Sequence, residues 1–442
     1  MRIPKKPPDI WDIGVEGLLA KAAGPEYQAL ARLCEERYLH WDKLVFIARG
    51  QGLEPEPAWA MVKMGRMVRY RELPLRGADR PLRFLSTDGM QRSLMLIDRE
   101  LAGQIGVGDE QPFSRSDRER FIVRALREEA IASSMLEGAA TTRVEARRML
   151  KKGRKPRTRG ERMVLNNYRA IQFIREHGST NLSDEFLLEL QGMLTVDTLD
   201  DPEQVGRFRT SDDEVAVVDQ RDGEVVHTPP DAAELRERLD ALYTFANEDD
   251  NDATEFIHPV IKACILHFQI GFDHPFCDGN GRTARALFYW FMLRSGYWLF
   301  EYLPISRLIY DAPGKYVRAY LYSETDDYDI TYFLRYHIAV ISRARKQLSA
   351  YIARKHAEMR TARTVFSSDA ALNHRQRETL LEISRNPDRF FTIDEHRDKH
   401  GVIYETARTD LLKLAERGYL VKSREGRKFV FAAGPKLADA MS

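Results

Sequence analysis

The 442-residue sequence is poor in cysteine and contains no long apolar run. Its three cysteines, Cys34, Cys264 and Cys277, are too few to build a disulfide framework and favour a reducing compartment. No apolar stretch is long enough to span a bilayer, which argues against a membrane helix. Residues 1–8 are rich in proline and lysine and lack the apolar segment of a signal peptide. We therefore expect a cytoplasmic protein without a membrane partner.

The sequence also lacks an excess of either charge. Lysine and arginine together number 68, and aspartate and glutamate 67, which gives a net charge of +1 at neutral pH. A chain with this balance has no overall field that draws it to nucleic acid or to an anionic membrane. Its length allows about two or three domains with substantial apolar cores.

The most informative stretch, His274-Pro-Phe-Cys-Asp-Gly-Asn-Gly-Arg-Thr-Ala-Arg285, lies between two apolar segments. The following segment, residues 284–293, is apolar almost all round, which predicts a buried helix that ends at Gly296. The preceding segment predicts a helix with one apolar face, at spacings i, i+4, i+7 and i+11. The residues on that face are Ile261, Ile265, Phe268 and Phe272.

The turn between these helices has the features of an anion site. Gly279 and Gly281 give the backbone the freedom to turn tightly into the second helix. The first N–H groups of a helix are unpaired and lie at the positive end of its dipole, an arrangement that suits phosphate. Arg282 and Arg285 are three residues apart, so both fall on one face of the first turn and add donors for further phosphate oxygens.

Two more side chains of this stretch carry chemistry. Asp278 offers a hard carboxylate at the edge of the turn, where a Mg²⁺ that bridges phosphates would bind. His274 is the one side chain here that takes up a proton near neutral pH. Each residue alone has an ordinary structural explanation, such as a helix end or a solvated face. Together they predict transfer of a phosphoryl-type group to a hydroxyl.

From His274 to Arg285 the sequence matches, position for position, the HPFx(D/E)GNGRxxR signature of the Fic (filamentation induced by cAMP) family, and it resembles that family along about half of its length. The resemblance implies a mainly α-helical Fic core that transfers AMP from ATP to a Ser, Thr or Tyr hydroxyl of a target protein. It implies that His274 is the base and that Asp278 holds Mg²⁺. The residues that it implies for phosphate binding are Gly279, Asn280, Gly281, Arg282 and Arg285.

The segment Ser133-Ser-Met-Leu-Glu137-Gly138 ends a helix that we expect to begin at a capping box, Ser116-Asp-Arg-Glu119. A glutamate at the negative end of a helix dipole is mildly unfavourable, and from spacing alone we would expect it to be exposed and without a role. The segment is similar, however, to the (S/T)xxxE(G/N) inhibitory helix of Fic proteins. That resemblance implies that Glu137 pairs with Arg285 and restrains the enzyme.

Residues 215–218 and 224–230 are two β-branched runs around Asp222-Gly223, which predicts a β-hairpin. A purely structural hairpin is one interpretation. In Fic proteins the hairpin at this place is a flap over the nucleotide that pairs with an extended target segment, which implies that Val217 and Val218 lie at the nucleotide.

A helix that begins near Lys315 is similar to the Fic helix whose first tyrosine lies at the adenine. By that resemblance Tyr316 stacks on the base, and the alternative is an ordinary core tyrosine. Relatives often have an asparagine eight positions further on, where this chain has Glu324.

We expect helices in the N-terminal region over residues 25–50 and 57–70. The residues expected to point inward are Leu30, Leu33, Tyr38, Trp59, Val62 and Met67. The predicted domains are an N-terminal helical region at 1–115, the Fic domain at 116–350, a helical connector at 351–372 and a C-terminal domain at 373–442. The N-terminal region would serve as a scaffold or as a homodimer surface.

The C-terminal part predicts a helix from Asn373, a second from a capping box at Thr392–Glu395, a third over 404–418, and two short strands. This order is similar to a winged helix-turn-helix domain, which would bind DNA or, as an alternative, a protein. The residues expected at a DNA groove and at the wing are Thr406, Arg408, Thr409, Arg424, Arg427 and Lys428.

Three hypotheses of function follow. The first is a protein adenylyltransferase restrained by Glu137. The second is an enzyme that removes AMP from proteins, because the same glutamate positions water in some relatives. The third is a DNA-bound regulator whose Fic core senses a nucleotide.

Overall fold

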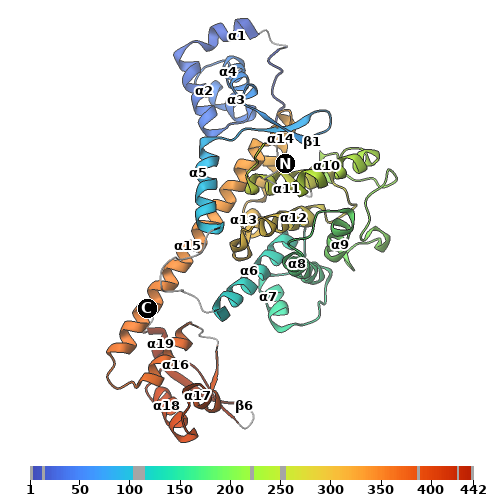
Figure 1. Cartoon of the computed structure of the whole chain (residues 1–442). Helices are drawn as coiled ribbons and strands as arrows, with labels where there is room; N and C mark the ends of the chain where they lie inside the picture. Colours follow the sequence, from blue (N-terminus) through green and yellow to red (C-terminus); the bar gives the residue numbers. More distant parts are fainter. Residues whose placement is uncertain are drawn as a thin grey trace. The chain divides into compact units, whose positions relative to one another are not determined.

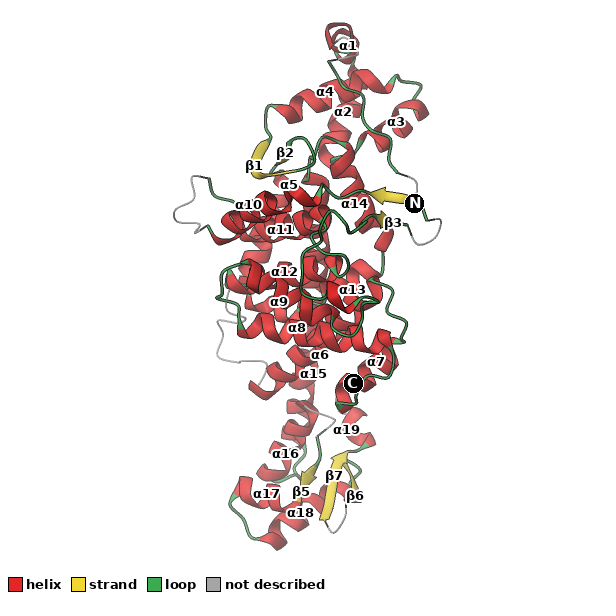
Figure 2. Cartoon of the chain, turned by 90° about the vertical axis from the view of Figure 1, so that its right-hand side faces the viewer, coloured by secondary structure: helices red, strands yellow, loops and turns green. Residues whose placement is uncertain are grey.

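The computed structural model describes residues 3–11, 15–102, 115–219, 223–248, 255–385, 389–425 and 428–439. Helices dominate this part of the chain, and its strands form three small antiparallel sheets (Figures 1 and 2). The chain divides into two compact units. The first is Met1–Ile105 with Val123–Arg345, and the second is Gly106–Ile122 with Lys346–Ser442. No helix of the described residues is both long and apolar enough to cross a membrane.

The first unit begins with a group of helices followed by a β-hairpin and a further helix. Their bounds are α1 Val15–Ala22, α2 Pro25–Arg37, α3 Trp41–Gly50, α4 Pro55–Met67, β1 Arg71–Arg76, β2 Pro81–Phe84, α5 Asp88–Ile97 and the π-helical turn Asp98–Ala102. The single helix expected over 25–50 is wrong. Tyr38 adopts the left-handed region (φ 52°, ψ 57°) and ends α2. His40 then caps α3 by accepting a hydrogen bond from the Asp42 amide.

The apolar pattern of these helices is largely as expected. Leu30, Tyr38, Trp59 and Val62 are buried, and Leu33 is half-buried. The inward placement of Met67 is wrong, because this residue occupies the frayed last turn of α4 and is exposed.

The N-terminal helices are joined to the rest of the first unit by buried polar contacts. Tyr38 Oη donates a hydrogen bond of 2.6 Å to Asp329, which follows the helix α14 (Pro313–Thr325). Arg66 Nη1 donates to Tyr332 Oη at 2.8 Å, and Lys63 forms an ion pair with Asp326. Buried charged contacts of this kind are satisfied only in one arrangement, so they fix how this region packs on the core.

The remaining helices of the first unit form the core around the signature. Their bounds are α6 Arg115–Leu136, α7 Arg143–Lys152, α8 Arg159–Glu176, α9 Asp184–Thr195, α10 Leu235–Asn247, α11 Pro259–Asp273, α12 Asn280–Arg294, α13 Ile305–Tyr310, α14 Pro313–Thr325 and α15 Thr331–Ser368. The start of α6, as far as Ile122, and the part of α15 after Arg345 belong to the second unit. Short 3₁₀ turns lie at Pro202–Gln204, Ala232–Glu234 and Trp298–Tyr302.

Helices α11 and α12 lie side by side at the centre of this core (Figures 1 and 2). The apolar face predicted for α11 is confirmed, because Ile261, Ile265, Phe268 and Phe272 are all buried. Helix α12 is buried over nearly its whole length, as its all-round apolar sequence predicted. Two such helices provide a rigid support for the turn between them.

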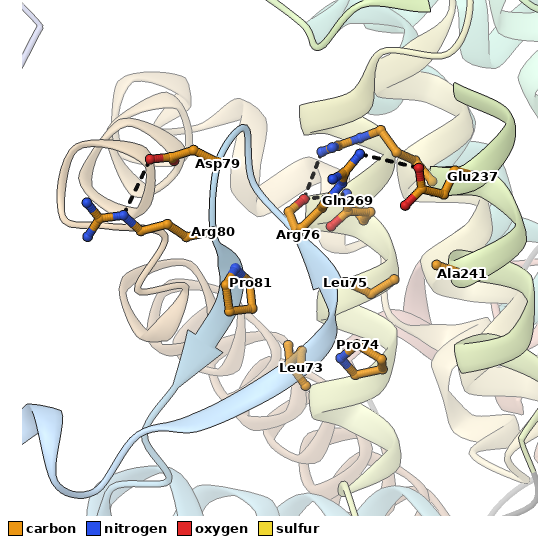
Figure 3. A pocket seen from close by; sticks show the side chains of 11 residues that line it. Leu73, Pro74, Leu75, Arg76, Asp79, Arg80, Pro81, Glu237, Ala241 and Gln269 are labelled. Atoms are coloured by element: carbon orange, nitrogen blue, oxygen red, sulfur yellow. Dashed lines mark hydrogen bonds and ion pairs between the residues drawn. The ribbon is translucent and has the colours of Figure 1, made fainter. Parts of the chain in front are cut away.

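The β1–β2 hairpin, which the sequence did not predict, stands beside α10 and α11 (Figure 3). A cavity of about 330 Å³ lies beneath it, and apolar side chains such as Leu73 and Leu75 form part of its lining. Arg238 of α10 donates to the carbonyl oxygens of Arg76 and Gly77 at 2.8 and 2.9 Å, so a buried cation ties the hairpin to the core.

The second unit contains α16 His374–Arg385, β5 Phe391–Thr392, α17 Ile393–His400, α18 Tyr404–Glu416, β6 Leu420–Glu425, β7 Lys428–Ala433 and α19 Pro435–Asp439. Its strands form an antiparallel sheet of order β5-β7-β6. The predicted capping box is confirmed, because the Thr392 hydroxyl accepts from the Glu395 amide and the Glu395 carboxylate accepts from the Thr392 amide. The expected helices and hairpin are present, and β5 was not predicted.

Some expectations fall outside the described residues. They are the side chains of the proposed capping box Ser116–Glu119, the turn residue Asp222, and Arg427 of the expected wing.

Candidate active site

His274 lies directly after α11, with a left-handed backbone (φ 43°, ψ 60°) that is uncommon for a residue with a side chain. Its Nδ1 donates a hydrogen bond of 2.5 Å to the Gly271 carbonyl oxygen, which leaves Nε2 with its lone pair. Burial, together with the charge of His227, lowers the pKa of His274 to about 4. At neutral pH this half-buried ring is therefore a neutral base with one free nitrogen.

Side chains from outside the helix close the end of α11. His227 of β4 (Val225–His227) bonds through Nε2 to the Phe272 carbonyl oxygen at 2.7 Å. Arg209 donates to the carbonyl oxygens of His274 at 2.7 Å and Asp273 at 3.2 Å. The last carbonyls of a helix have no partner within it, so these contacts satisfy them and fix the backbone that carries His274.

The turn after His274 is held by Asn280. Its amide Nδ2 donates to the Phe276 carbonyl oxygen at 2.7 Å, and its Oδ1 accepts from the Phe276 amide at 3.0 Å. Gly279 has a φ of 86°, and a Cβ there would lie 2.7 Å from Thr195 Cγ2. Because both polar atoms of the Asn280 side chain are bonded to the backbone of Phe276, the side chain shapes the turn. The predicted contribution of Asn280 to phosphate binding would therefore come from its backbone amide.

Arg282 is buried behind this turn, with 1 % of its surface exposed. Its Nη1 donates to the Leu194 carbonyl oxygen at 2.9 Å, and its Nη2 lies 3.4 Å from Asp278 Oδ2. Its Nε is buried and has no acceptor among the described residues. A buried guanidinium with an unused donor is costly unless an anion completes its contacts, which is what a phosphate would do.

Asp278 is the carboxylate that could hold a metal ion at this turn. Each of its oxygens accepts one hydrogen bond, from the Gly279 amide and from Arg282, and 48 % of the side chain is exposed. Lone pairs therefore remain for a hard cation such as Mg²⁺. The described residues contain no group of three or more His, Cys, Asp and Glu side chains that could hold a metal by themselves. The site fits an ion that takes most of its ligands from phosphates and water.

Arg285 is hydrogen-bonded to residues at the end of α6 through its Nε and Nη2. Its Nη2 donates to Glu137 Oε1 at 2.8 Å and to the Ser133 carbonyl oxygen at 3.0 Å, and its Nε donates to Ser133 Oγ at 2.9 Å. The Glu137 carboxylate lies against Gly281, where an added Cβ would collide with it. The exposed, idle glutamate expected from spacing alone is therefore wrong, and the pair implied by the resemblance is formed.

The charge state of Glu137 follows from its surroundings. Burial alone would raise the pKa of Glu137, but the positive charges of Arg285 and Arg282 outweigh it and the pKa is lowered. The carboxylate is thus ionised at neutral pH and lies at the N-terminus of α12, where the helix dipole also favours an anion.

The expected base-binding residue belongs to an aromatic cluster. Tyr316 Oη and His267 Nε2 are 2.9 Å apart, and the Tyr316 ring lies edge-on to Tyr320 with centroids 5.3 Å apart. Because Tyr316 is half-buried, it retains some accessible surface, and its contact with a base stays a prediction. Glu324, eight residues further on, is 2.9 Å from His227 Nδ1.

The predicted hairpin is present as β3 (Val217–Val218) paired antiparallel with β4. Val217 lies opposite His227, and Val218 lies opposite Val225. The two valines of the second pair are each 48 % exposed, so one surface of this short hairpin is open. The role of Val217 and Val218 at a nucleotide stays a prediction.

Sequence reasoning missed Gln191, Arg209 and His227. Gln191 Nε2 donates to the Asp278 carbonyl oxygen at 3.1 Å, and its Oε1 accepts from the Gly206 amide at 2.6 Å. These contacts join residues far apart in the chain and have no local pattern. The only indication in the sequence was the position of Arg209, an arginine shortly before the predicted hairpin.

Residues 181–292 match the profile of the Fic/DOC family. The chain is 33 % identical over 96 residues to "Protein adenylyltransferase Fic" of Nematostella vectensis, and this match covers 22 % of this chain and 20 % of that protein. It is 28 % identical over 189 residues to "Protein adenylyltransferase fic-1" of Caenorhabditis elegans, and this match covers 41 % of this chain and 34 % of that protein. The chain thus spans 20 % and 34 % of the length of these two relatives.

The fold is similar to that of a solved Fic family protein from Desulfovibrio desulfuricans G20. The TM-score is 0.51 at 20 % sequence identity, and the match covers 79 % of this chain and 97 % of the other. The matched profile includes the whole signature from His274 to Arg285. Residues 181–292 are therefore similar to Fic domains, and homologues of the chain are named adenylyltransferases.

Proposed function

We propose that this Fic-domain chain transfers AMP from ATP to a hydroxyl of a target protein and that Glu137 restrains the reaction. One observation carries the proposal: His274, neutral and with Nε2 free, is separated by a single short turn from the amides and buried arginines at the start of α12. A base next to an anion site is the arrangement that hydroxyl attack on a phosphate ester requires.

In the proposed reaction the amides of Asn280 and Gly281 and the unused Nε of Arg282 bind phosphate oxygens, whereas the Gly279 amide stays on Asp278. Asp278 would hold Mg²⁺, which supplies further neutralisation of phosphate charge. His274 Nε2 takes the proton of the target hydroxyl, whose oxygen attacks the α-phosphorus of ATP. The bond to the bridging oxygen breaks, pyrophosphate leaves, and AMP remains on the target.

The β3–β4 hairpin is suited to hold the target. Its exposed valine pair and short strands leave backbone groups and apolar surface for an added extended segment. Because β4 ends at His227, which bonds to the end of α11, a segment on this hairpin would lie near His274.

The restraint follows from the position of Glu137. Its ionised carboxylate lies against Gly281 and uses an Nη donor of Arg285, so a terminal phosphate at this end of α12 would meet a negative charge instead of a free guanidinium. Removal of the carboxylate frees that Arg285 donor and the space in front of the amides.

Labelled ATP with Mg²⁺ tests the proposal. We expect Glu137→Gly to increase protein labelling at least about tenfold, since one charge conflict of this size is worth over a kcal/mol. The double variant Glu137→Gly/His274→Ala should give no label. Glu128→Gln is the matched control on the same helix, because Glu128 pairs with Arg143 and Arg147 instead of the signature.

The Glu137→Gly protein must bind ATP for the test to count, which calorimetry measures directly. ATP binding without any label, on the chain itself or on proteins of a cell extract, would refute the transfer reaction.

The ionised state of Glu137 also favours a second reaction, removal of AMP from a protein. A carboxylate whose pKa is lowered and which acts electrostatically on His274 is placed to orient water. Loss of AMP from a modified protein that depends on Glu137 would support this hydrolase. Loss that continues in Glu137→Gln would contradict it.

A DNA-bound regulator is the third candidate, because α18 exposes Tyr404, Arg408 and Thr409 on one face. Exposed side chains of this kind at the start of a third helix are what a winged helix-turn-helix domain uses in the major groove. Sequence-selective DNA retention by the full chain, together with no transfer by any variant of the Fic core, would favour it. Binding of a protein partner instead would identify the alternative interaction surface.

A further inference from the structure

We propose that His227 is a positioning residue for His274: held as an imidazolium between Glu324 and the end of α11, it keeps the His274 ring neutral and correctly placed. The catalytic meaning of this inference rests on the proposed AMP transfer. The arrangement of the two rings does not, and it can be measured without any reaction.

Both ring nitrogens of His227 face acceptors. Nδ1 is 2.9 Å from Glu324 Oε2 of α14, and Nε2 is 2.7 Å from the Phe272 carbonyl oxygen of α11. A carbonyl oxygen and an ionised carboxylate only accept, so both contacts are satisfied when both nitrogens carry a proton. A neutral imidazole has one N–H and would leave one of these contacts unmade.

The surroundings of His227 support the charged form. Its side chain is 9 % exposed and that of Glu324 is 17 % exposed. Burial alone would lower the pKa of His227, but the hydrogen bond and charge of Glu324, with the Phe272 carbonyl and Asp273, outweigh it and raise the pKa. The acidic groups that act on this ring thus come from both α14 and α11.

The charge reaches His274 directly. The two rings are 6.0 Å apart between centroids, so a cation on one opposes a second cation on the other. Arg209 opposes protonation of His274 in the same sense, whereas Glu137 and the Gly271 carbonyl favour it. The balance keeps His274 neutral, and its backbone is held by the same two side chains, His227 and Arg209, that close α11.

The β3–β4 hairpin carries His227 and so links target binding to His274. His227 is paired with Val217, so the cation belongs to the strand pair proposed to hold the target. A shift of the hairpin would take the imidazolium away from Phe272 and Glu324 and would change both the charge near His274 and the end of its helix.

The imidazole signals of the intact ¹⁵N-histidine-labelled protein test the inference by NMR. We expect His227 to carry two N–H protons at neutral pH, and His274 to be neutral with its proton on Nδ1. In Glu324→Gln and in His227→Gln the pKa of His274 should rise by about one to two, the size expected for loss of a unit charge at this distance. Glu324→Gln keeps the shape of the side chain, so it remains informative if His227→Gln does not fold.

His258→Gln is the matched control. His258 caps the opposite end of α11, where it accepts from the Val260 amide and lies 3.0 Å from Asp98. Its loss removes an imidazole with a carboxylate partner from the same helix, and we expect no change in the His274 signal.

The activity readout is the pH dependence of transfer in the Glu137→Gly background. The base must be neutral, so activity falls as the pH falls through the pKa of His274. His227→Gln and Glu324→Gln should therefore lose activity at higher pH than the parent, by the same shift as NMR gives, with KM for ATP unchanged. A general structural role would instead lower kcat at every pH.

A neutral His227 at pH 6–7 in the unmodified protein, or an unchanged pKa of His274 in Glu324→Gln, would overturn the inference. If the NMR shifts appear but no variant transfers AMP, the proposed function fails and the coupling of the two histidines stands.

Discussion

Two buried polar clusters of this protein differ in how completely their hydrogen bonds are made. In the second unit Asp410 accepts from Asn373 and Arg375 at 2.7 Å each, and His396 Nε2 lies 3.4 Å away. This cluster is closed, because its members satisfy one another. At the signature turn the buried Nε of Arg282 has no partner among the described residues.

Whether a polar cluster has all its hydrogen bonds made indicates whether it serves stability or ligand binding. A closed polar network fixes a fold and gives nothing to a ligand. A cluster with unused donors and acceptors is destabilising by itself and is retained where a ligand completes it. We interpret the Asp410 cluster as structural, and at the signature turn we propose that a phosphate completes the contacts of Arg282.

The largest expected effect comes from breaking the open cluster. In the Glu137→Gly background, Arg282→Ala should reduce AMP transfer by about 100-fold or more, as expected for loss of a charged donor to a phosphate. Arg375→Ala, which removes an arginine from the closed cluster, should leave transfer unchanged. Equal losses in both variants would contradict the distinction.

The closed cluster should respond in stability instead. Asp410→Asn removes the charge that Arg375 and His396 face, and we expect the unfolding free energy of the second unit to fall by about 2–3 kcal/mol. Calorimetry of the full chain, which can separate the transitions of two units, measures the loss. The labelling rate of the Glu137→Gly protein should not change when this substitution is added.

We expect a substitution at Glu137 to affect both AMP transfer and stability. Glu137→Gln should increase transfer while it lowers the unfolding free energy of the first unit by about 1–2 kcal/mol, because Arg285 is then buried beside a neutral amide. Measurements of thermal unfolding and of protein labelling on the same variant test whether activity rises while stability falls. An increase in both stability and activity would show that the pair is not the restraint.

The smallest effect is a pH dependence of the second unit. Burial lowers the pKa of His396, and that of Asp410 is lowered because hydrogen bonds from Arg375 and Asn373 outweigh its burial. Both groups bind protons more readily when unfolded, so the stability they contribute is present above their unfolded pKa values and is lost as the pH falls. Unfolding between about pH 6.5 and 3 should show this loss. In Asp410→Asn the dependence should be weaker.

The signature turn could be predicted because its information is local. Glycines, arginines and the histidine act within one turn, and the apolar periods of α11 and α12 mark the helices that flank it. The pair of Glu137 and Arg285 is 148 positions apart, so the family resemblance indicated it and spacing alone did not.

Other parts of the site could not be predicted, because their partners are distant in the chain. Arg209 and His227 reach the end of α11 from 64 and 45 positions away. The β1–β2 hairpin was missed since Pro74 and its charged neighbours weaken the strand pattern. The break at Tyr38 coincides with a buried hydrogen bond from its side chain to Asp329, a residue 291 positions away that local propensity does not include.

The contact of Gly281 with the Glu137 carboxylate has an evolutionary consequence. A methyl group at this position would enter the volume of the Glu137 carboxylate, although Gly281 lies in α12 and Glu137 follows the end of α6. A lineage that gains a side chain at 281 must therefore displace or shorten residue 137, and these two positions are expected to covary among sequences that keep this arrangement.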